Sequence, residues 1–293
     1  MRTDGWLSKN TARLDGRTVA ITGATGGLGT PLCRYLLSLG ASLLLLDRNR
    51  QKSDALKSAL LAEYPQASIG QITLDLSDIG SVKAACDALE QQPIDVLIHN
   101  AGAYSIPRCI CDTGYDNVFQ INFVSPYYMT RRLLSRLRQR RGRVVVVGSI
   151  AHNYSKSDAD DVDFSTRKRA SLVYGNAKRY LMFSLHELFK DERQVSFAVA
   201  HPGITFTGIT AHYPPVIFAI IKHPMKIIFM HPRKAALSVL RGVFAPTPYG
   251  KWWGPWLFDV WGRPALRTLR TCSVRERQDI AARAEAIYEK MNG

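Results

Sequence analysis

The sequence predicts an α/β fold: a single domain in which helices cover both faces of a doubly wound parallel sheet, followed by a C-terminal extension. Short apolar runs alternate with helical patterns from residue 17 to about residue 200, and parallel strands need such crossover connections. A glycine-rich turn, TGATGGLG at residues 22–29, separates the first apolar run from the first helical pattern. The chain has 293 residues, of which 46% are hydrophobic, and no Ser/Gly-rich or Pro-rich linker divides it. This length supports one sizeable core.

The glycine turn lies in a setting that is typical of a binding motif. Residues 18–22 are apolar and β-branched, which predicts a buried strand, and residues 32–39 predict a helix. Gly23, Gly27 and Gly29 lie between the strand and the helix. Glycine lets the backbone approach a pyrophosphate closely, and the charge of that group then lies at the helix N-terminus. Because the spacing TGxxxGxG differs from the commoner GxGxxG, a purely structural turn is the alternative for this motif taken alone.

The second predicted strand, residues 43–46, ends in Asp47 and Arg48. An acidic side chain about 20 positions after the glycines can accept hydrogen bonds from an adenosine ribose diol, and it would repel the 2′-phosphate of NADP. Arg48 would favour NADP if its guanidinium binds that phosphate, and it would not affect the choice of cofactor if it lies in solvent. Gly26 offers no second positive charge in the turn. These residues favour NAD over NADP.

Further polar motifs follow the later predicted strands or open a long helix. Ligands bind beyond the carboxyl ends of the strands in open parallel sheets, so these motifs are expected to gather at one site. In chain order they are Asp75 and Leu76 in LDLSD, Asn100-Ala101-Gly102 after a strand at 95–99, Asn122 in QINFVSP, Ser149 after a strand at 144–147, Tyr174 and Lys178 in a helix, and His201-Pro202-Gly203, with Thr207 beyond, after a strand at 195–200.

Tyr174 and Lys178 are the strongest candidates for catalysis. A tyrosine phenol has a pKa of about 10, which is too high for an effective base near neutral pH. Lys178 lies one helical turn later on the same face, and its ammonium, with a positive nicotinamide ring, would lower that pKa. Ser149 can donate a hydrogen bond to a substrate oxygen as charge develops on it. Taken singly, each has a simpler interpretation: a surface pair, a turn former and, for Asn122, a side chain that satisfies the backbone at a helix irregularity.

Over roughly residues 15–210, the order and spacing of these motifs resemble those of the short-chain dehydrogenase/reductase family, whose members have a Rossmann fold. The resemblance implies that Tyr174 is the general acid/base, that Ser149 orients the substrate, and that Lys178 also binds the nicotinamide ribose. It further implies that Asn122 supports a water relay to Lys178. His99 stands where the family usually has another asparagine. The implied cofactor-binding residues are Gly23, Thr25, Gly27, Leu28, Gly29, Asp47, Arg48, Asp75, Leu76, Asn100, Ala101, Gly102, Tyr174, Lys178, Pro202, Gly203 and Thr207.

Two further segments resemble the retinol dehydrogenase and protochlorophyllide reductase branch of that family. The first is a polar insertion, residues 155–169, expected to be a loop near the mouth of the site. The second is the tail, with the aromatic stretch 249–262 and a final helix, 274–291, that a capping box of Ser273 and Glu276 would begin. The tail is therefore expected to be structured. Its tryptophans, Trp252, Trp253, Trp256 and Trp261, either pack in the core or wall a pocket for a retinoid, steroid or terpenoid.

Residues 214–230, PPVIFAIIKHPMKIIFM, are strongly apolar but interrupted by charged residues and prolines. They are too short and too broken for a transmembrane helix, which leaves core, a substrate lid or a hydrophobic patch on a bilayer surface. The resemblance favours a lid at about residues 204–234. The expected organisation is a polar surface arm at 1–15, a dinucleotide-binding and catalytic domain at 16–248 and a C-terminal extension at 249–293.

The net charge is +15, and seven arginines fall between residues 131 and 143. They are expected to form a solvated face at the end of the helix that begins near residue 117, where they complement the helix dipole. Charge alone does not establish nucleic-acid binding, and a peripheral contact with an anionic membrane surface is the better second choice. Five sparse cysteines predict no metal site and a reduced, cytoplasmic setting, and the N-terminus has no apolar signal segment.

Together these features predict an NAD(P)-dependent oxidoreductase that interconverts a lipophilic secondary or allylic alcohol and its carbonyl, with NAD as the favoured cofactor. A scaffold that binds cofactor without turnover and a peripheral membrane protein are the alternatives. The resemblance also allows a homodimer or a homotetramer. No nucleic-acid partner is expected.

Overall fold

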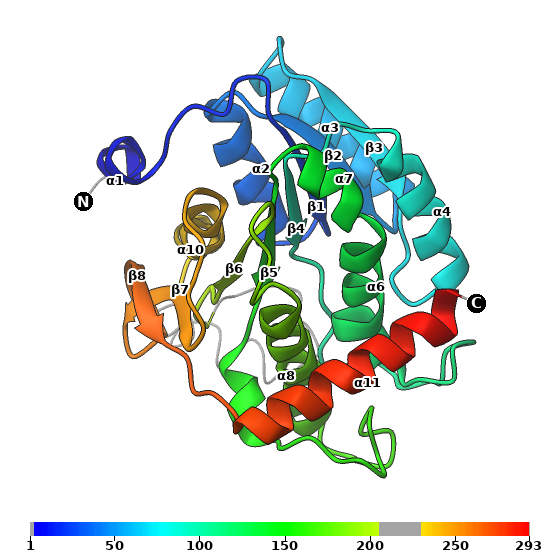
Figure 1. Cartoon of the computed structure of the whole chain (residues 1–293). Coiled ribbons are helices and arrows are strands. Elements are labelled where there is room, and N and C mark those ends of the chain that lie inside the picture. Colours follow the sequence, from blue (N-terminus) through cyan, green and yellow to red (C-terminus); the bar gives the residue numbers. More distant parts are fainter. Residues whose placement is uncertain (1–2, 205–229, 293) are drawn as a thin grey trace, which may run out of the picture.

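A computed structural model of the chain describes residues 3–204 and 230–292, and it confirms the predicted doubly wound α/β fold (Figure 1). Eight strands form one sheet in the order β3-β2-β1-β4-β5-β6-β7-β8, in which only β8 runs antiparallel to its neighbour. The strands are β1 (Thr18–Thr22), β2 (Ser42–Asp47), β3 (Ile69–Thr73), β4 (Val96–His99), β5 (Arg143–Val147), β6 (Ser196–Ala200), β7 (Lys251–Leu257) and β8 (Trp261–Thr268).

The strand order reverses at β1, which pairs with β2 on one side and with β4 on the other. Successive connections therefore leave from β1 toward opposite edges of the sheet, and a crevice opens at the carboxyl ends of the strands. One face of the sheet is covered by α2 (Gly29–Ser38), α3 (Arg50–Glu63) and α10 (Pro232–Phe244). The other is covered by α4 (Ile79–Glu90), α6 (Ser125–Arg132), α7 (Leu134–Gln139) and α8 (Ala170–Leu188).

The central strands read as continuous apolar runs because both of their faces are buried. Along β5, Val144 and Val146 belong to the core beneath α6 and α8, whereas Val145 and Val147 belong to the core beneath α2 and α10. Side chains alternate between the two faces of a strand, so four consecutive valines supply both cores. The same alternation explains why the predicted strands lacked a polar face.

The N-terminal segment differs from the polar surface arm that was expected for residues 1–15. Residues Thr3–Asn10 form a short helix, α1, in which Trp6 is buried. Trp6 and Leu14 join the core beneath α10, and Arg241 Nη1 of that helix donates a hydrogen bond to Asn10 O at 3.0 Å. One large apolar side chain is enough to dock an otherwise polar segment.

The C-terminal tail is structured, as predicted. The β7–β8 hairpin extends the sheet, and the last helix, α11 (Val274–Asn292), crosses α8 and α6 (Figure 1). The capping box forms only in part. Ser273 Oγ accepts a hydrogen bond from Glu276 N at 3.1 Å, but the Glu276 carboxylate turns to Arg179 on α8 instead of back to the Ser273 backbone. A charge-assisted bidentate pair is stronger than a neutral capping bond.

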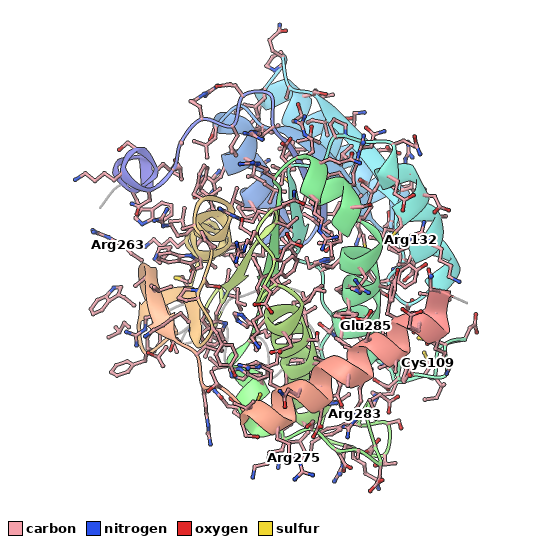
Figure 2. All side chains as sticks on the ribbon, in the orientation of Figure 1. Cys109, Arg132, Arg263, Arg275, Arg283 and Glu285 are labelled. Atoms are coloured by element: carbon pink, nitrogen blue, oxygen red, sulfur yellow. The ribbon has the colours of Figure 1, made fainter. Side chains whose placement is uncertain are left out.

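The arginine-rich stretch from 131 to 143 is not the solvated face that was expected. Most of its guanidinium groups bind carboxylates that lie far away in the sequence. These ion pairs are Arg131 with Glu285, Arg132 with Asp87 and Glu90, Arg138 with Glu192, and Arg140 with Asp95. Arg132 and Glu285 are labelled in Figure 2. Much of the positive charge here is thus neutralised locally and ties α6 and α7 to neighbouring elements.

The inserted stretch, residues 155–169, contains no regular helix or strand but is not wholly polar. Phe164 is buried, and Arg108 donates hydrogen bonds to the backbone oxygens of Phe164, Ser165 and Arg167. Within the ranges 3–204 and 230–292, no helix is long and apolar enough to cross a membrane. Most of the predicted lid lies outside these described ranges.

Candidate active site

A cleft of about 650 Å³ opens at the carboxyl ends of β1, β2, β4, β5 and β6. Nearly all of the predicted site residues line it. The exceptions are Gly29 and Asn122, which lie behind its wall, and Thr207, which is outside the described residues. The predicted residues along the cleft are Gly23, Thr25, Gly27, Leu28, Asp47, Arg48, Asp75, Leu76, Asn100, Ala101, Gly102, Ser149, Tyr174, Lys178, Pro202 and Gly203.

The glycine turn has the geometry that only glycine allows. Gly23 has φ +67°, and a Cβ there would lie 3.0 Å from the Ala101 Cβ. A Cβ at Gly29 would collide with the Gly23 carbonyl and the Ala24 backbone. Gly23 therefore forms part of the wall of the cleft, whereas Gly29 allows α2 to begin directly behind it. The side-chain amide of Asn100 then joins the turn to β4 by donating to Thr22 O and Gly23 O, both at 3.0 Å.

Asp47 lies where the sequence predicted it, but its carboxylate is already engaged. Asp47 Oδ1 accepts hydrogen bonds from Thr25 N at 3.0 Å and Thr25 Oγ1 at 2.9 Å, while Oδ2 accepts one from Ser53 Oγ at 3.2 Å. Asp47 is buried at the end of β2, and its hydrogen bonds with Thr25 hold the glycine turn against that strand end. Beside it, the Arg48 side chain is 73% exposed and lies 4.0 Å from Asp75 Oδ2.

Lys52 is a residue of this part of the cleft that the motifs did not identify. It lies in the first turn of α3, whose N-cap Asn49 accepts a hydrogen bond from Lys52 N at 2.9 Å. From the sequence, a second positive charge was sought only inside the glycine turn, where Gly26 offers none. Lys52 follows Arg48 by four residues and lies at the start of a helix, and this spacing was the signal that could have identified it as the second cation.

Asn122 lies in a single turn of π-helix, Gln120–Val124. Its Nδ2 donates to Ala103 O and Val118 O, both at 2.8 Å, whereas its buried Oδ1 has no hydrogen-bond partner among the described residues. A Cβ at Gly102 would lie 2.7 Å from Asn122 Oδ1 and 3.5 Å from Lys178 Nζ. The unpaired oxygen and the ammonium therefore face a common point next to Gly102, and the wider π-turn brings the amide there.

Ser149, Tyr174 and Lys178 come together where β5 ends and α8 passes. Ser149 follows β5 after one residue, Gly148, and its hydroxyl lies close enough to the Tyr174 phenol to lower the pKa of that phenol. Lys178 Nζ lies 5.5 Å from the centre of the Tyr174 ring, and both side chains are buried. Gly175 lets α8 pack closely against the segment after β5, because a Cβ at Gly175 would collide with the Ala151 carbonyl oxygen. The ring of Tyr104, another residue not identified from the motifs, packs edge-on against Tyr174 at 5.3 Å.

Burial dominates the ionisation of this group. It raises the pKa of Tyr174 to about 12, although the hydrogen bond with Ser149 acts in the opposite direction. It lowers the pKa of Lys178 to about 8. Burial thus dominates the pKa of Tyr174 in the polypeptide itself. The expectation that Lys178 and a positive nicotinamide ring together lower this pKa concerns the complex with cofactor and stays a prediction. Burial and then the charge of Lys178 lower the pKa of His99 to about 3, and its Nε2 lies 2.8 Å from Thr130 Oγ1.

The outer part of the cleft has a mixed lining. Tyr154 and Ser171, which flank the inserted loop, contribute to it, while residues 155–169 do not. His201 lies at its inner end, stacked on Trp252 with ring centres 4.7 Å apart. None of the four tail tryptophans lines the cleft. Their predicted packing role holds for Trp252, which is buried.

The fold and the cleft define a doubly wound α/β protein with a Tyr-x-x-x-Lys pair facing a glycine turn. The family model described as short chain dehydrogenase matches residues 17–214. The chain therefore belongs to the short-chain dehydrogenase family of oxidoreductases.

Sequence relatives place it in the retinol dehydrogenase-like branch of that family, as the insertion and the tail predicted. Retinol dehydrogenase 14 from Homo sapiens is 31% identical over 217 residues, which cover 68% of this chain and 65% of that protein. The chain thus matches slightly less than two thirds of the length of this relative.

Solved structures agree with the fold over a longer region. A putative uncharacterized protein from Mycobacterium Paratuberculosis is 25% identical, with a TM-score of 0.72, and the match covers 96% of this chain and 94% of that one. The RhlG/NADP active-site complex of Pseudomonas aeruginosa is 24% identical, with a TM-score of 0.59, and the match covers 80% of this chain and 91% of that one. The second likeness shows the fold alone.

Proposed function

We propose that this protein is an NAD(P)-dependent oxidoreductase that interconverts a lipophilic alcohol and its aldehyde or ketone by hydride transfer. The observation that carries the proposal is the convergence of Ser149, Tyr174 and Lys178 in the same cleft as the glycine turn. A turn that only glycine permits, and the unpaired oxygen of Asn122 beside an ammonium, fit a bound dinucleotide with a proton path next to it.

In this proposal each side chain has a separate task. The nicotinamide, when bound, supplies or accepts the hydride. Tyr174 donates a proton to the carbonyl oxygen, or removes it from the alcohol, while Ser149 hydrogen-bonds the same oxygen as its charge changes. Lys178 holds a positive charge close to the Tyr174 ring and opposes the burial that raises the pKa of the phenol. The Asn122 Oδ1 atom can accept a hydrogen bond from a water molecule that relays protons to Lys178.

We propose NADP(H) as the preferred cofactor, which reverses the preference for NAD inferred from Asp47. The Asp47 carboxylate is engaged by Thr25 and Ser53, so it offers little to a ribose diol. Arg48 and Lys52 line the same end of the cleft, and two cations there suit a 2′-phosphate.

Titration of NADPH and NADH, with Arg48→Ser as the test variant, distinguishes the two cofactors. We expect NADPH to bind more tightly, and Arg48→Ser to weaken NADPH about 10- to 100-fold, because a hydrogen bond to a charged group contributes about 1.5–3 kcal/mol. NADH should be little affected. Arg50→Ser is the matched control, because Arg50 pairs with Asp54 outside the cleft. Tighter binding of NADH would restore Asp47 as the selecting residue.

Apolar residues around the reacting end of the cleft support a lipophilic substrate. Ile121, Ile150, Ala151 and Ile204 line it together with the ring of Tyr104. A retinoid-, steroid- or terpenoid-like alcohol fits this lining, and Retinol dehydrogenase 14 is named for such a substrate. The lid proposed at about residues 204–234 would complete the site.

Turnover by purified protein tests the reaction itself. We expect oxidation or reduction within a panel of lipophilic alcohols and carbonyls, and a loss of about 10²- to 10⁴-fold in Tyr174→Phe without loss of cofactor binding. Tyr64→Phe, which removes a phenol outside the cleft, should retain activity. If the wild type binds cofactor and turns over nothing in the panel, the protein is a cofactor-binding scaffold and the enzyme proposal is refuted.

A further inference from the structure

The β7–β8 hairpin carries two large apolar side chains that the described part of the fold leaves exposed. Trp256 and Phe258, here called the aromatic tip, are 55% and 77% exposed. The indole of Trp256 rests against the facing strand, because a Cβ at Gly262 would collide with it. The Trp256 side chain is thus held in place while about half of its surface remains open to solvent. Such an exposed aromatic surface calls for an explanation beyond folding.

The turn of this hairpin contains a residue that such turns do not favour. Val260 N donates to Leu257 O at 3.0 Å, and the two residues between them, Phe258 and Asp259, have φ of +53° and +57°. Two-residue turns of this kind favour Asn, Asp and Gly, so Asp259 suits its position whereas Phe258 is strained at positive φ. Phe258 keeps this strained backbone conformation although its side chain is exposed. Backbone strain at an exposed position indicates that the side chain serves in binding and not in folding.

The free edge of the hairpin is poorly suited to pairing with another strand. β8 is the last strand of the sheet and pairs only with β7 among the described residues. Pro264 lacks a backbone N–H, and Arg263 and Arg267 lie on either side of it. Proline and charge on an edge strand oppose the addition of a further strand. A second copy of this chain is therefore a poor occupant for this surface.

The charges around the aromatic tip favour an anionic partner. Arg263 is exposed and forms no ion pair with the part of the chain that the structure describes, while Arg267 pairs with Asp259 of the turn. Figure 2 shows Arg263 extending away from the hairpin into solvent. Aromatic rings next to arginines, in a chain of net charge +15, have the composition of a segment that lies in the headgroup region of a bilayer.

We propose that the β7–β8 hairpin docks the protein on an anionic lipid surface, with the aromatic tip inserted among the headgroups and Arg263 bound to their negative charges. This surface is separate from the arginine-rich stretch between 131 and 143, and the proposal does not depend on the chemistry of the cleft. A Cβ at Gly203, which lines the cleft, would lie 2.6 Å from Val260 O, so the docked turn would lie directly beside the cleft.

The test is flotation of the full chain with vesicles of phosphatidylcholine, with or without phosphatidylserine. We expect binding to the anionic vesicles and weak binding to the neutral ones. Phe258→Asn should reduce the affinity about tenfold, as expected when one buried phenyl ring is lost. Arg263→Glu should reduce it about tenfold or more, and increasingly so at low salt. Ile110→Asn is the matched control, because Ile110 is 60% exposed and its neighbour Cys109 lies on the opposite side from Arg263 in Figure 2.

Melting temperature separates membrane docking from a role in folding. Asn is well suited to positive φ, so Phe258→Asn should leave the melting temperature unchanged or raise it by about 2 °C while vesicle binding falls. A lower melting temperature would show that another part of this chain covers Phe258, which overturns the proposal. Equal binding by the wild type and Phe258→Asn would overturn it as well. So would self-association of the wild type that Phe258→Asn abolishes without any vesicle binding.

Discussion

Glu276→Gln tests how α11 is attached to the helix that carries Tyr174 and Lys178. Glu276 Oε1 and Oε2 accept hydrogen bonds from Arg179 Nε and Nη2, both at 2.7 Å. Glu276 Oε1 also accepts one from Ser157 N at 3.0 Å. The side chains of Arg179 and Glu276 are 7% and 18% exposed, so the pair is largely withdrawn from water. The substitution keeps the shape of the side chain and removes its charge, which leaves the Arg179 guanidinium without a carboxylate partner on the helix that carries Lys178.

Removal of one partner from a buried pair costs about 3–5 kcal/mol. Because Glu276 is partly exposed and glutamine can still accept hydrogen bonds, we expect the lower end, a loss of about 3 kcal/mol in the free energy of unfolding. That loss corresponds to a fall of about 5 °C in melting temperature for a chain of this size. Glu63→Gln is the matched control. Its partner Arg34 is bound with the same bidentate geometry, but the two side chains are 27% and 42% exposed. A surface pair of this kind contributes about 0.5 kcal/mol.

The pH dependence of the loss gives a second check. Burial alone would raise the pKa of Glu276, but the hydrogen bonds from Arg179 and Ser157 outweigh burial and hold the pKa below its usual value of 4.5. A carboxyl whose pKa is depressed by folding stabilises the protein fully above its unfolded pKa, and this contribution is lost as the pH falls. The stability difference between wild type and Glu276→Gln should therefore be constant near neutral pH and shrink below about pH 4.5.

Urea unfolding of the wild type, Glu276→Gln and Glu63→Gln between about pH 3 and pH 8 measures both effects. A Glu276→Gln loss no larger than the control loss would refute the buried pair as the attachment of α11. A difference that does not shrink at low pH would show that the charge of Glu276 is not the cause.

Two further outcomes follow from the geometry of the cleft. Gly102→Ala should lower the free energy of unfolding by about 1–3 kcal/mol and impair turnover, because the new Cβ would lie 2.7 Å from Asn122 Oδ1. Thermal melts and activity assays measure the two effects, and unchanged activity would show that Asn122 takes no part in the reaction. Lys178 has a pKa lowered by burial from 10.5 to about 8, so the native state binds fewer protons than the unfolded state between these values, and wild-type stability should rise with pH in that window. Lys178→Met should lack this rise in urea titrations at pH 7.5, 8.5 and 9.5, and a rise that persists in the variant would assign it to another group.

The parts of the site that could be predicted from the sequence are those that depend on short stretches of chain. A strand, a glycine turn and a helix are contiguous, and Tyr174 and Lys178 share a helix face because they are one turn apart. The engagement of Asp47 could not be predicted in the same way. Thr25 lies 22 residues from Asp47 in the sequence, and which partner a carboxylate takes depends on how the turn is placed over the end of β2.

Long-range ion pairs caused the main errors. The arginines between 131 and 143 were expected in solvent because their partners, such as Glu285 and Glu192, lie far along the chain. Glu276 was assigned to a capping box for the same reason, since Arg179 is 97 residues away. Thr207 and most of the proposed lid lie outside the described residues, so their predicted roles stay predictions.

Helix α11 also bears on how the molecule is made. It reaches from Asp158 O, which accepts a hydrogen bond from Arg283, to Thr113 O, which accepts one from Lys290. α11 follows every other described element along the chain, so α8 and its neighbours keep an uncovered apolar flank until α11 has been synthesised. A chain that stalls before α11 is made would expose this apolar flank, and chaperones and proteases would recognise it as incompletely folded.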